Sequence, residues 1–160
     1  MSFKPELTVA AVVEQHGRFL MVEELIARQR VFNQPAGHVE EGEELLDAVV
    51  RETLEETAWQ FAPQAIIGVY LWRNPATQKS FLRVAYSGTV SDQDAQRPLD
   101  AGILRVHWLT RAQLLGHESR LRSPMVLRCV DDYLAGVRFP LTLLSQLPLD
   151  QVEARAAVLL

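Results

Sequence analysis

The sequence predicts one α/β domain in which a mixed β-sheet packs between helices. Two apolar, β-prone runs precede an amphipathic acidic helix, and three more such runs and a second helical pattern follow it. Strands and helices in this order build layered α/β domains. The chain of 160 residues is long enough to bury a sizeable core, and no linker-like segment divides it. We therefore expect a single domain over residues 1–160.

Composition excludes several broad classes of protein. Hydrophobic residues make up 48% and charged residues 22% of the chain, as in ordinary globular proteins. The net charge of −4 argues against a general nucleic-acid binder, which needs a basic surface. No stretch approaches the ~18 apolar residues of a membrane span, and the N-terminus lacks a secretion signal. The single Cys129 has no partner for an intrachain disulfide. We expect a cytoplasmic protein with no nucleic-acid or membrane partner.

The first two strands are expected at residues 7–14 and 18–23, where apolar and β-branched residues dominate. Gly17 lies in the short connector between them, which favours a hairpin. Arg28 and Arg30 follow, just before the acidic stretch of the chain. They are candidates for neutralising a phosphate, and ordinary surface charge explains them equally well.

The most informative stretch spans residues 37–59. Its eight acidic residues and one arginine give it a formal charge of −7, whereas the whole chain carries −4. The acidic residues are Glu40, Glu41, Glu43, Glu44, Asp47, Glu52, Glu55 and Glu56. A polar loop around Gly42 opens the stretch, and no helix breaker follows before residue 57. We therefore predict a helix that carries most of these carboxylates.

The spacing of the carboxylates sets two of them on the apolar side of this helix. At about 100° per residue, Glu52 and Glu56 fall on the same stripe as Leu45 and Val49, with Glu55 at its edge. Buried carboxylates at this spacing repel one another and need a counter-charge. A hard divalent cation such as Mg²⁺, which binds carboxylate oxygens and substrate phosphates, meets that need.

A solvated acidic face is the alternative interpretation, because blocks of like charge usually face water. Arg51 would then pair with Asp47 and Glu55 at helical spacing. The shared apolar stripe and the glycine-containing loop before the helix favour the metal site.

Three further strands are expected at residues 64–73, 80–90 and 103–109, the first two joined by a turn at residues 74–77. Thr110 is the expected N-cap of a short helix to residue 115. A longer helix is expected from Ser123-Pro124 to about residue 135, because serine followed by proline is typical of a helix start. The chain from Phe139 onward is apolar and receives no predicted role.

Residues 37–59 resemble the conserved box of the Nudix family, whose fixed positions are occupied here by Gly37, Glu43, Arg51, Glu52, Thr53, Glu55, Glu56, Ala58 and Trp59. Two positions depart from the pattern. Thr53 replaces an apolar residue, and Ala58 replaces the glycine that ends the helix, so the turn must form without the usual left-handed glycine. No carboxylate is lost. The resemblance implies the α/β/α sandwich of that family.

The same resemblance implies catalytic roles for Arg51, Glu52, Glu55 and Glu56. Its implied metal ligands are Glu52, Glu55, Glu56 and the main-chain carbonyl of Gly37, while Glu43 supports the loop or a further metal. The implied ion is Mg²⁺, with Mn²⁺ as the alternative. Arg51 orients a glutamate by a charge-assisted hydrogen bond. Glu52 is the first candidate for the general base and Asp100 a distant second, and a turn-forming aspartate is the alternative interpretation of Asp100.

Five residues outside the box are candidates for substrate binding: Arg28, Gln34, Trp72, Phe81 and Arg122. Trp72 and Phe81 can lie opposite each other on neighbouring strands, where they would stack a heterocycle. Packing in the core is the commoner role of such aromatic pairs. Arg122 precedes the last helix and is placed to reach a phosphate tail.

Segments beyond the box are similar to the NudJ-type branch of bacterial Nudix phosphatases, including residues 3–5, 33–38, 81–83 and 121–124. This similarity implies release of orthophosphate from nucleoside tri- and diphosphates and from pyrimidine and thiamine pyrophosphates. The alternatives are an ADP-ribose or ADP-sugar pyrophosphatase and a non-catalytic nucleotide-binding regulator. The expected partner is a small phosphoanhydride substrate, and the expected state is a monomer or a homodimer.

Overall fold

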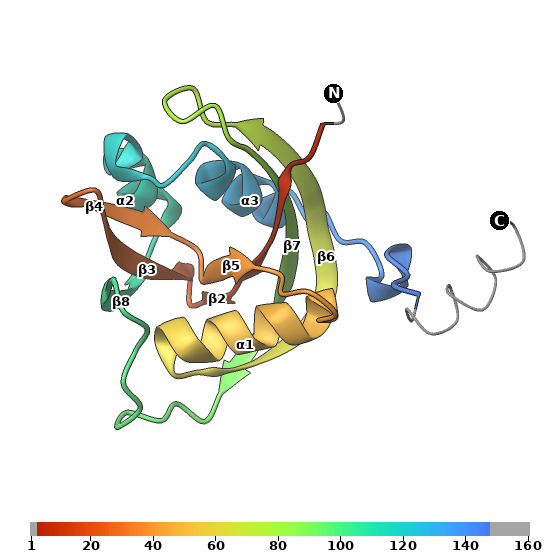
Figure 1. Cartoon of the computed structure of the whole chain (residues 1–160). Helices are drawn as coiled ribbons and strands as arrows, with labels where there is room; N and C mark the ends of the chain where they lie inside the picture. The colour runs from red at the N-terminus through yellow and green to blue at the C-terminus, as the bar shows by residue number, and fades with distance from the viewer. Residues whose placement is uncertain (1–2, 148–160) are drawn as a thin grey trace, which may run out of the picture.

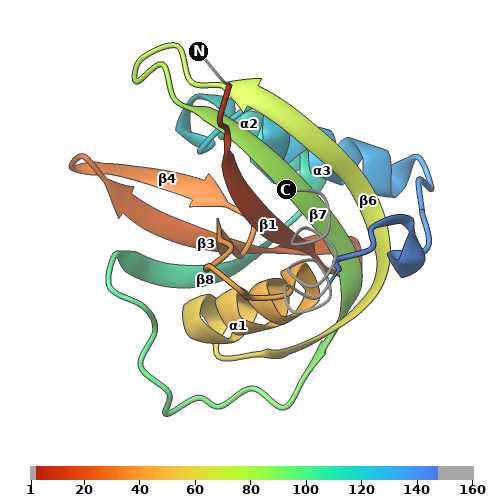
Figure 2. The ribbon, with the colours of Figure 1, turned by 45° about the vertical axis from the view of Figure 1, so that its right-hand side comes forward.

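A computed structural model describes residues 3–147 and contains two β-sheets with helices packed around them (Figures 1 and 2). In chain order the elements are β1 (Glu6–Val12), β2 (Glu14–Gln15), β3 (Arg18–Ile26), β4 (Gln29–Asn33), β5 (Ala36–His38), α1 (Leu45–Thr57), β6 (Gln60–Arg73), β7 (Ser80–Ser91), β8 (Ile103–Leu109), α2 (Arg111–Gly116), the 3₁₀ turn η1 (Glu118–Arg120), α3 (Met125–Leu134) and the 3₁₀ turn η2 (Leu141–Leu143).

The central sheet has the strand order β5-β1-β7-β6. β1 and β7 run parallel, with Val9 opposite Val84, while β1–β5 and β6–β7 are antiparallel. The sheet is therefore mixed, as predicted. The second sheet has the order β2-β3-β4, and β8 pairs with the other edge of β3.

The central sheet lies between α1 on one face and α3 on the other (Figure 1). Val9 and Ala11 of β1 face the α1 side, whereas Ala10 and Val12 join the cluster that contains Val126 of α3. Because both faces of β1 are buried, the strand is a continuous apolar run rather than an alternating one. These layers confirm the predicted α/β/α sandwich.

The predicted hairpin around Gly17 is present, with β2 and β3 paired on either side of it. β4 and β5 were not predicted, because both are short and β4 carries polar residues. β6 begins at Gln60, earlier than the predicted start at residue 64. Pro63 lies beside a bulge in that strand, and a proline is tolerated in a sheet at such a position.

Helix α1 ends at Ala58, which adopts the left-handed conformation itself, with φ 61° and ψ 13°. Its backbone N–H donates to the carbonyl of Leu54. An alanine in this conformation costs about 1–2 kcal/mol. The helix therefore ends with the usual left-handed turn even though alanine replaces glycine, and the alanine is strained.

The segment that begins at Phe139 contacts both β6 and the start of α1. Phe139 and Ile66 exchange two backbone hydrogen bonds of 2.8 and 2.9 Å. Gln146 then caps α1 from a distance: its Oε1 accepts from the N–H of Leu45 at 3.1 Å, and its Nε2 donates to the carbonyl of Glu43 at 2.9 Å. The N-cap residue of α1 provides no side-chain cap of its own. The rest of the C-terminal segment, residues 148–160, lies outside the described residues.

Between residues 3 and 147, no helix has the length and apolar character needed to cross a membrane.

Replacing Gln146 with alanine should lower the free energy of unfolding by about 1 kcal/mol, the usual loss when a helix N-cap is removed. Chemical denaturation followed by circular dichroism measures this change. Leu147→Ala is the matched control, because Leu147 is 69% exposed and contributes little burial. Equal stabilities of the two variants would show that water replaces the cap without loss.

Candidate active site

Helix α1 carries the acidic side chains of the site on the side that faces the sheet. Ala48 and Val49 are fully buried against the sheet. Glu52 and Glu56 lie on the same side and are only 9% and 6% exposed. The predicted burial of these two carboxylates is therefore confirmed. Apolar packing holds the helix in place, and the carboxylates lie at the edge of its packed face.

Arg51 is the hub of the charged network. Its Nε and Nη2 donate to the two carboxylate oxygens of Glu43 at 2.7 and 3.0 Å. Its Nη1 donates to Glu52 at 2.8 Å and to Glu55 at 3.2 Å, and Nη2 also donates to the carbonyl of His38. Arg51 lowers the pKa of Glu43, whose carboxylate also accepts from the N–H of Glu40. Arg51 thus orients three carboxylates.

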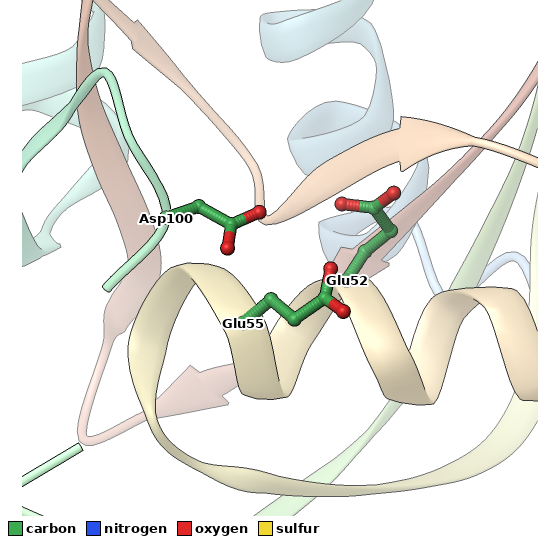
Figure 3. A group of neighbouring side chains, drawn as sticks. All are labelled: Glu52, Glu55 and Asp100. Atoms are coloured by element: carbon green, nitrogen blue, oxygen red, sulfur yellow. The ribbon is translucent and has the colours of Figure 1, made fainter. Parts of the chain in front are cut away.

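Three carboxylates form a cluster that fits a metal ion. Ligand oxygens of Glu52, Glu55 and Asp100 lie within 4.8 Å of one another. Figure 3 shows that Glu52 and Glu55 come from α1, whereas Asp100 reaches the same space from the loop before β8. A set of carboxylate oxygens at this spacing suits a hard divalent cation such as Mg²⁺.

The loop that carries Asp100 is fixed to the end of α1. The N–H of Asp100 donates to the carbonyl of Glu55 at 3.0 Å, and the N–H of Asp94 donates to the carbonyl of Ala58 at 2.9 Å. These carbonyls belong to the last turn of the helix, where no intrahelical partner is available. Sequence reasoning ranked Asp100 as a distant second candidate because its position depends on these contacts.

The backbone of Gly37 lies directly against the carboxylate of Glu52 in the cluster. A Cβ atom at this position would overlap the carboxylate of Glu52. The requirement for glycine here is therefore close approach, and no unusual backbone conformation is involved. Gly37 pairs with Val9 in the sheet, so the strand β5 brings its backbone directly under the glutamate. This close approach of the Gly37 backbone to Glu52, which we call the glycine cradle, is a second observation that fits a metal site.

Glu56 lies behind the cluster. Its Oε2 accepts the backbone N–H of Ala36 at 2.9 Å. Burial raises the pKa of Glu56 to about 9, and the nearby carboxylates of Glu24 and Glu52 add to this effect. Burial also raises the pKa of Glu52, against the opposing influence of Arg51. The raised pKa predicts that Glu56 holds a proton at neutral pH when no cation is bound.

The five predicted substrate residues do not gather in one place. Arg28 is exposed at the turn between β3 and β4, with φ 66°. Gln34 is buried, and its amide is engaged by the carbonyl of Val126 and by Arg83. Arg122 lies near Glu24, whose pKa it lowers, and its N–H donates to the carbonyl of Phe32.

Trp72 and Phe81 stack on each other, with ring centroids 6.1 Å apart. They lie opposite each other on β6 and β7, on the face of the sheet that is turned away from α1. β6 and β5 are the two edges of the central sheet, so three strand spacings, or about 14 Å, separate the strand of Trp72 from the strand of Gly37.

Two polar residues near the site, one partly buried and one buried, were not predicted. Glu24 lies on β3 close to Glu56, and burial raises its pKa. Arg83 is only 4% exposed and donates to side chains of the segment before β5. Arg83 begins a run of β7 that is buried on both faces, and Glu24 lies where β3 changes from buried to exposed, so periodicity in the sequence gives no signal for them.

Comparisons with known proteins agree with this geometry. A family model described as NUDIX domain matches residues 4–128. Phosphatase NudJ of Escherichia coli strain K12 is 38% identical over 143 residues, which cover 89% of this chain and 92% of that protein. Phosphatase NudJ of Shigella flexneri gives the same values of 38%, 89% and 92%.

Solved structures show the same relationship. A NUDIX hydrolase from Nitrosomonas europaea matches with a TM-score of 0.88 and 40% identity, covering 91% of this chain and 99% of that chain. The NUDIX domain of Shewanella oneidensis NrtR, complexed with ADP ribose, matches with a TM-score of 0.67 and 20% identity over 84% of this chain and 89% of that chain, and so shares the fold. The acidic helix, the glycine cradle and these relatives lead to one conclusion: the chain belongs to the Nudix family and is a Nudix hydrolase.

Proposed function

We propose that this protein is a Mg²⁺-dependent phosphatase that releases orthophosphate from nucleoside tri- and diphosphates and from pyrimidine and thiamine pyrophosphates. The observation that carries the proposal is the cluster of Glu52, Glu55 and Asp100 above Gly37. The 38% identity to phosphatases NudJ supports the choice of terminal phosphate release over other hydrolyses.

Glu52 and Glu55 would hold the metal together with Asp100 and the main-chain carbonyl of Gly37. Glu56 stays a proposed ligand as well, although it lies outside the cluster of Glu52, Glu55 and Asp100 and its Oε2 accepts the N–H of Ala36. Mn²⁺ is the alternative ion for the same donor set. When bound, the ion neutralises charge on phosphate oxygens and makes a coordinated water more acidic. Both oxygens of Glu43 are held by Arg51, which favours the loop-supporting role for that residue.

The protein's own groups divide the remaining work. Arg51 fixes one oxygen of Glu52 and leaves the other free, so Glu52 is the proposed general base that takes the proton of the attacking water. Asp100 is the second candidate for that role. Arg122, beside Glu24, is the proposed cation for the substrate's outer phosphates. Roles for Arg28, Gln34, Trp72 and Phe81 in substrate binding stay predictions.

Cytoplasmic location and a monomeric or homodimeric state also stay predictions. The single Cys129 is buried, which is compatible with a reducing compartment.

Phosphorus NMR of product mixtures formed with Mg²⁺ in ¹⁸O-labelled water tests the proposed reaction. The panel contains a nucleoside triphosphate, a nucleoside diphosphate, thiamine pyrophosphate and ADP-ribose. Labelled orthophosphate from the first three shows attack on the terminal phosphorus. Nucleoside monophosphate from ADP-ribose alone would instead identify an ADP-ribose pyrophosphatase. No Mg²⁺-dependent turnover on any compound would favour a nucleotide-binding regulator.

Gly37→Ala should abolish most activity while the protein stays folded. The new methyl group occupies the space of the Glu52 carboxylate, which must rotate away from Glu55 and Asp100. We expect turnover to fall by about 100-fold, the upper range for disturbed metal-site support. Steady-state kinetics and a thermal melt measure the two effects.

Gly116→Ala is the matched control for this variant, because a Cβ at Gly116 meets no atom within 4 Å. It should leave turnover and melting temperature unchanged. Gly37→Ala with normal turnover would contradict the cradle that Gly37 provides for Glu52.

Glu56→Gln should lower turnover by about 100-fold and also change the pH dependence of stability. Between the ordinary pKa of 4.5 and the folded-state pKa of about 9, the metal-free folded protein binds a proton that the unfolded chain releases. The free energy of unfolding therefore falls as pH rises through this window. Glutamine does not titrate, so the variant should lose this part of the pH dependence.

Melting temperatures in excess chelator from pH 6 to pH 8 measure the difference between the wild type and Glu56→Gln. Glu41→Gln is the control, because Glu41 is an exposed acidic residue of the same loop and helix segment. Parallel pH curves for the wild type and Glu56→Gln would refute the buried, protonated state of Glu56.

A further inference from the structure

Arg83 is a buried arginine with an unusual set of partners. Its Nη1 donates to the side-chain oxygen of Gln34 and its Nη2 to that of Asn33, each at 3.1 Å. Its Nε is buried and has no hydrogen-bond partner. Among residues 3–147, no carboxylate lies within ion-pair distance of this guanidinium, although Glu24 is close enough to influence it. Burial raises the pKa of the Cys129 thiol, and Arg83 lies close enough to that thiol to oppose the rise. A buried charge without a directly paired carboxylate is costly.

The two amides lie in residues 33–37, the segment that runs from the last residue of β4, Asn33, through Gln34 and Pro35 into β5; we call this segment the connector. Gln34 is 1% exposed, and its Nε2 also donates to the carbonyl of Val126 in α3 at 2.8 Å. The guanidinium of Arg83 and the helix α3 therefore both bind the side chain of Gln34, near the start of this connector. Asn33 is buried as well, at 5% exposure, so neither amide exchanges these partners for bulk water.

The end of the same connector makes the backbone contacts of the acidic site. The N–H of Ala36 donates to Glu56, and Gly37 lies directly under the carboxylate of Glu52. Only one neighbour holds β5 in the sheet, since β5 is an edge strand that pairs with β1 at three positions. The N–H of Ala11 also donates to the carbonyl of Pro35, and Arg51 of α1 donates to the carbonyl of His38. The contacts of Asn33 and Gln34 with Arg83 add a further support to the position of β5.

Arg83 is placed to do this from across the sheet. It lies on β7 directly opposite Thr8 of β1, which in turn lies opposite His38 of β5. All three share the face of the sheet turned toward α3, because Val84 and Val9 occupy the α1 side. The long Arg83 side chain thus spans β1 on the far face of the sheet and reaches the connector.

We propose that Arg83 is a positioning residue that clamps residues 33–37, so that Ala36 and Gly37 hold Glu56 and Glu52 in the geometry required to bind the metal. This inference rests on the proposed metal dependence but not on which phosphoanhydride is the substrate. Arg83 acts through the connector and touches neither the metal nor the reacting phosphate.

Binding of Mn²⁺ to the enzyme without substrate, followed by the electron paramagnetic resonance signal of free Mn²⁺, tests the proposal. Arg83→Lys keeps the charge but replaces the planar fork by a point donor, which cannot hold both amide oxygens. The Kd for Mn²⁺ should rise about 10-fold or more, with a similar loss of kcat at limiting metal. KM at saturating metal should stay within about 2-fold, because no substrate contact is removed.

Asn33→Ala is the second variant, and it removes one of the two acceptors without placing a new charge in the core. It should weaken Mn²⁺ binding in the same direction, and the double variant should be no weaker than Arg83→Lys alone, as expected for groups that act as one unit. If Arg83→Lys does not fold, Asn33→Ala carries the test. Arg111→Lys is the control for loss of a bidentate arginine contact, since Arg111 binds Asp131 at the surface.

Unchanged Mn²⁺ affinity in folded Arg83→Lys or Asn33→Ala would overturn the proposal. So would a large rise in KM at unchanged Mn²⁺ affinity, because Arg83 would then contact the substrate itself. Failure of the wild-type enzyme to bind Mn²⁺ would refute the proposed metal dependence and the clamp together. A different product pattern in the phosphorus NMR experiment would change the assigned substrate and leave the role of Arg83 unaffected. The substrate assignment and the role of Arg83 therefore fail separately.

Discussion

The structure depends on holding several carboxylates close together beside the face of α1 that packs on the sheet. Glu52, Glu55 and Asp100 converge within 4.8 Å, and Glu56 lies buried behind them. Arg51 is the cation that binds this group directly, and it also neutralises Glu43. Burial raises the pKa of Glu56 and of Glu52, and for Glu52 it does so against the opposing influence of Arg51. Under the proposed metal dependence, a divalent cation would relieve the repulsion among these carboxylates by binding to them.

Rigid elements far apart in the sequence hold this strained group in place. Apolar packing fixes α1 on the sheet, and Gln146 caps its start from the opposite end of the described chain. β5 brings Gly37 under Glu52 and is itself held by one neighbouring strand and by the grip of Arg83 on the connector. Each support acts on backbone position. Small displacements of any of them would change the distances between carboxylates, on which metal affinity depends.

Sequence reasoning located the part of the site that is local in the chain. The stripe of Glu52 and Glu56 follows from helical periodicity, and the need for a glycine at position 37 follows from the resemblance to a family. Periodicity also gave most of the strands, while β4 and β5 were missed because they are short. Asp100 ranked low, and Arg83 and the cap by Gln146 were missed altogether. Their roles arise from contacts across long sequence separations, and each side chain alone is compatible with an ordinary surface or core position.

The end of α1 links one of the two departures from the family pattern to the site itself. Ala58 occupies the left-handed position usually filled by glycine, at a cost of about 1–2 kcal/mol. That turn directs the carbonyls of the last helical turn outward, where they accept from the loop before β8: Ala58 from the N–H of Asp94, and Glu55 from the N–H of Asp100. The loop that satisfies the helix end is therefore the loop that delivers the third carboxylate. The N–H of Ala58 donates to Leu54 and its carbonyl accepts from Asp94, so the residue that ends the helix also anchors the loop that delivers Asp100.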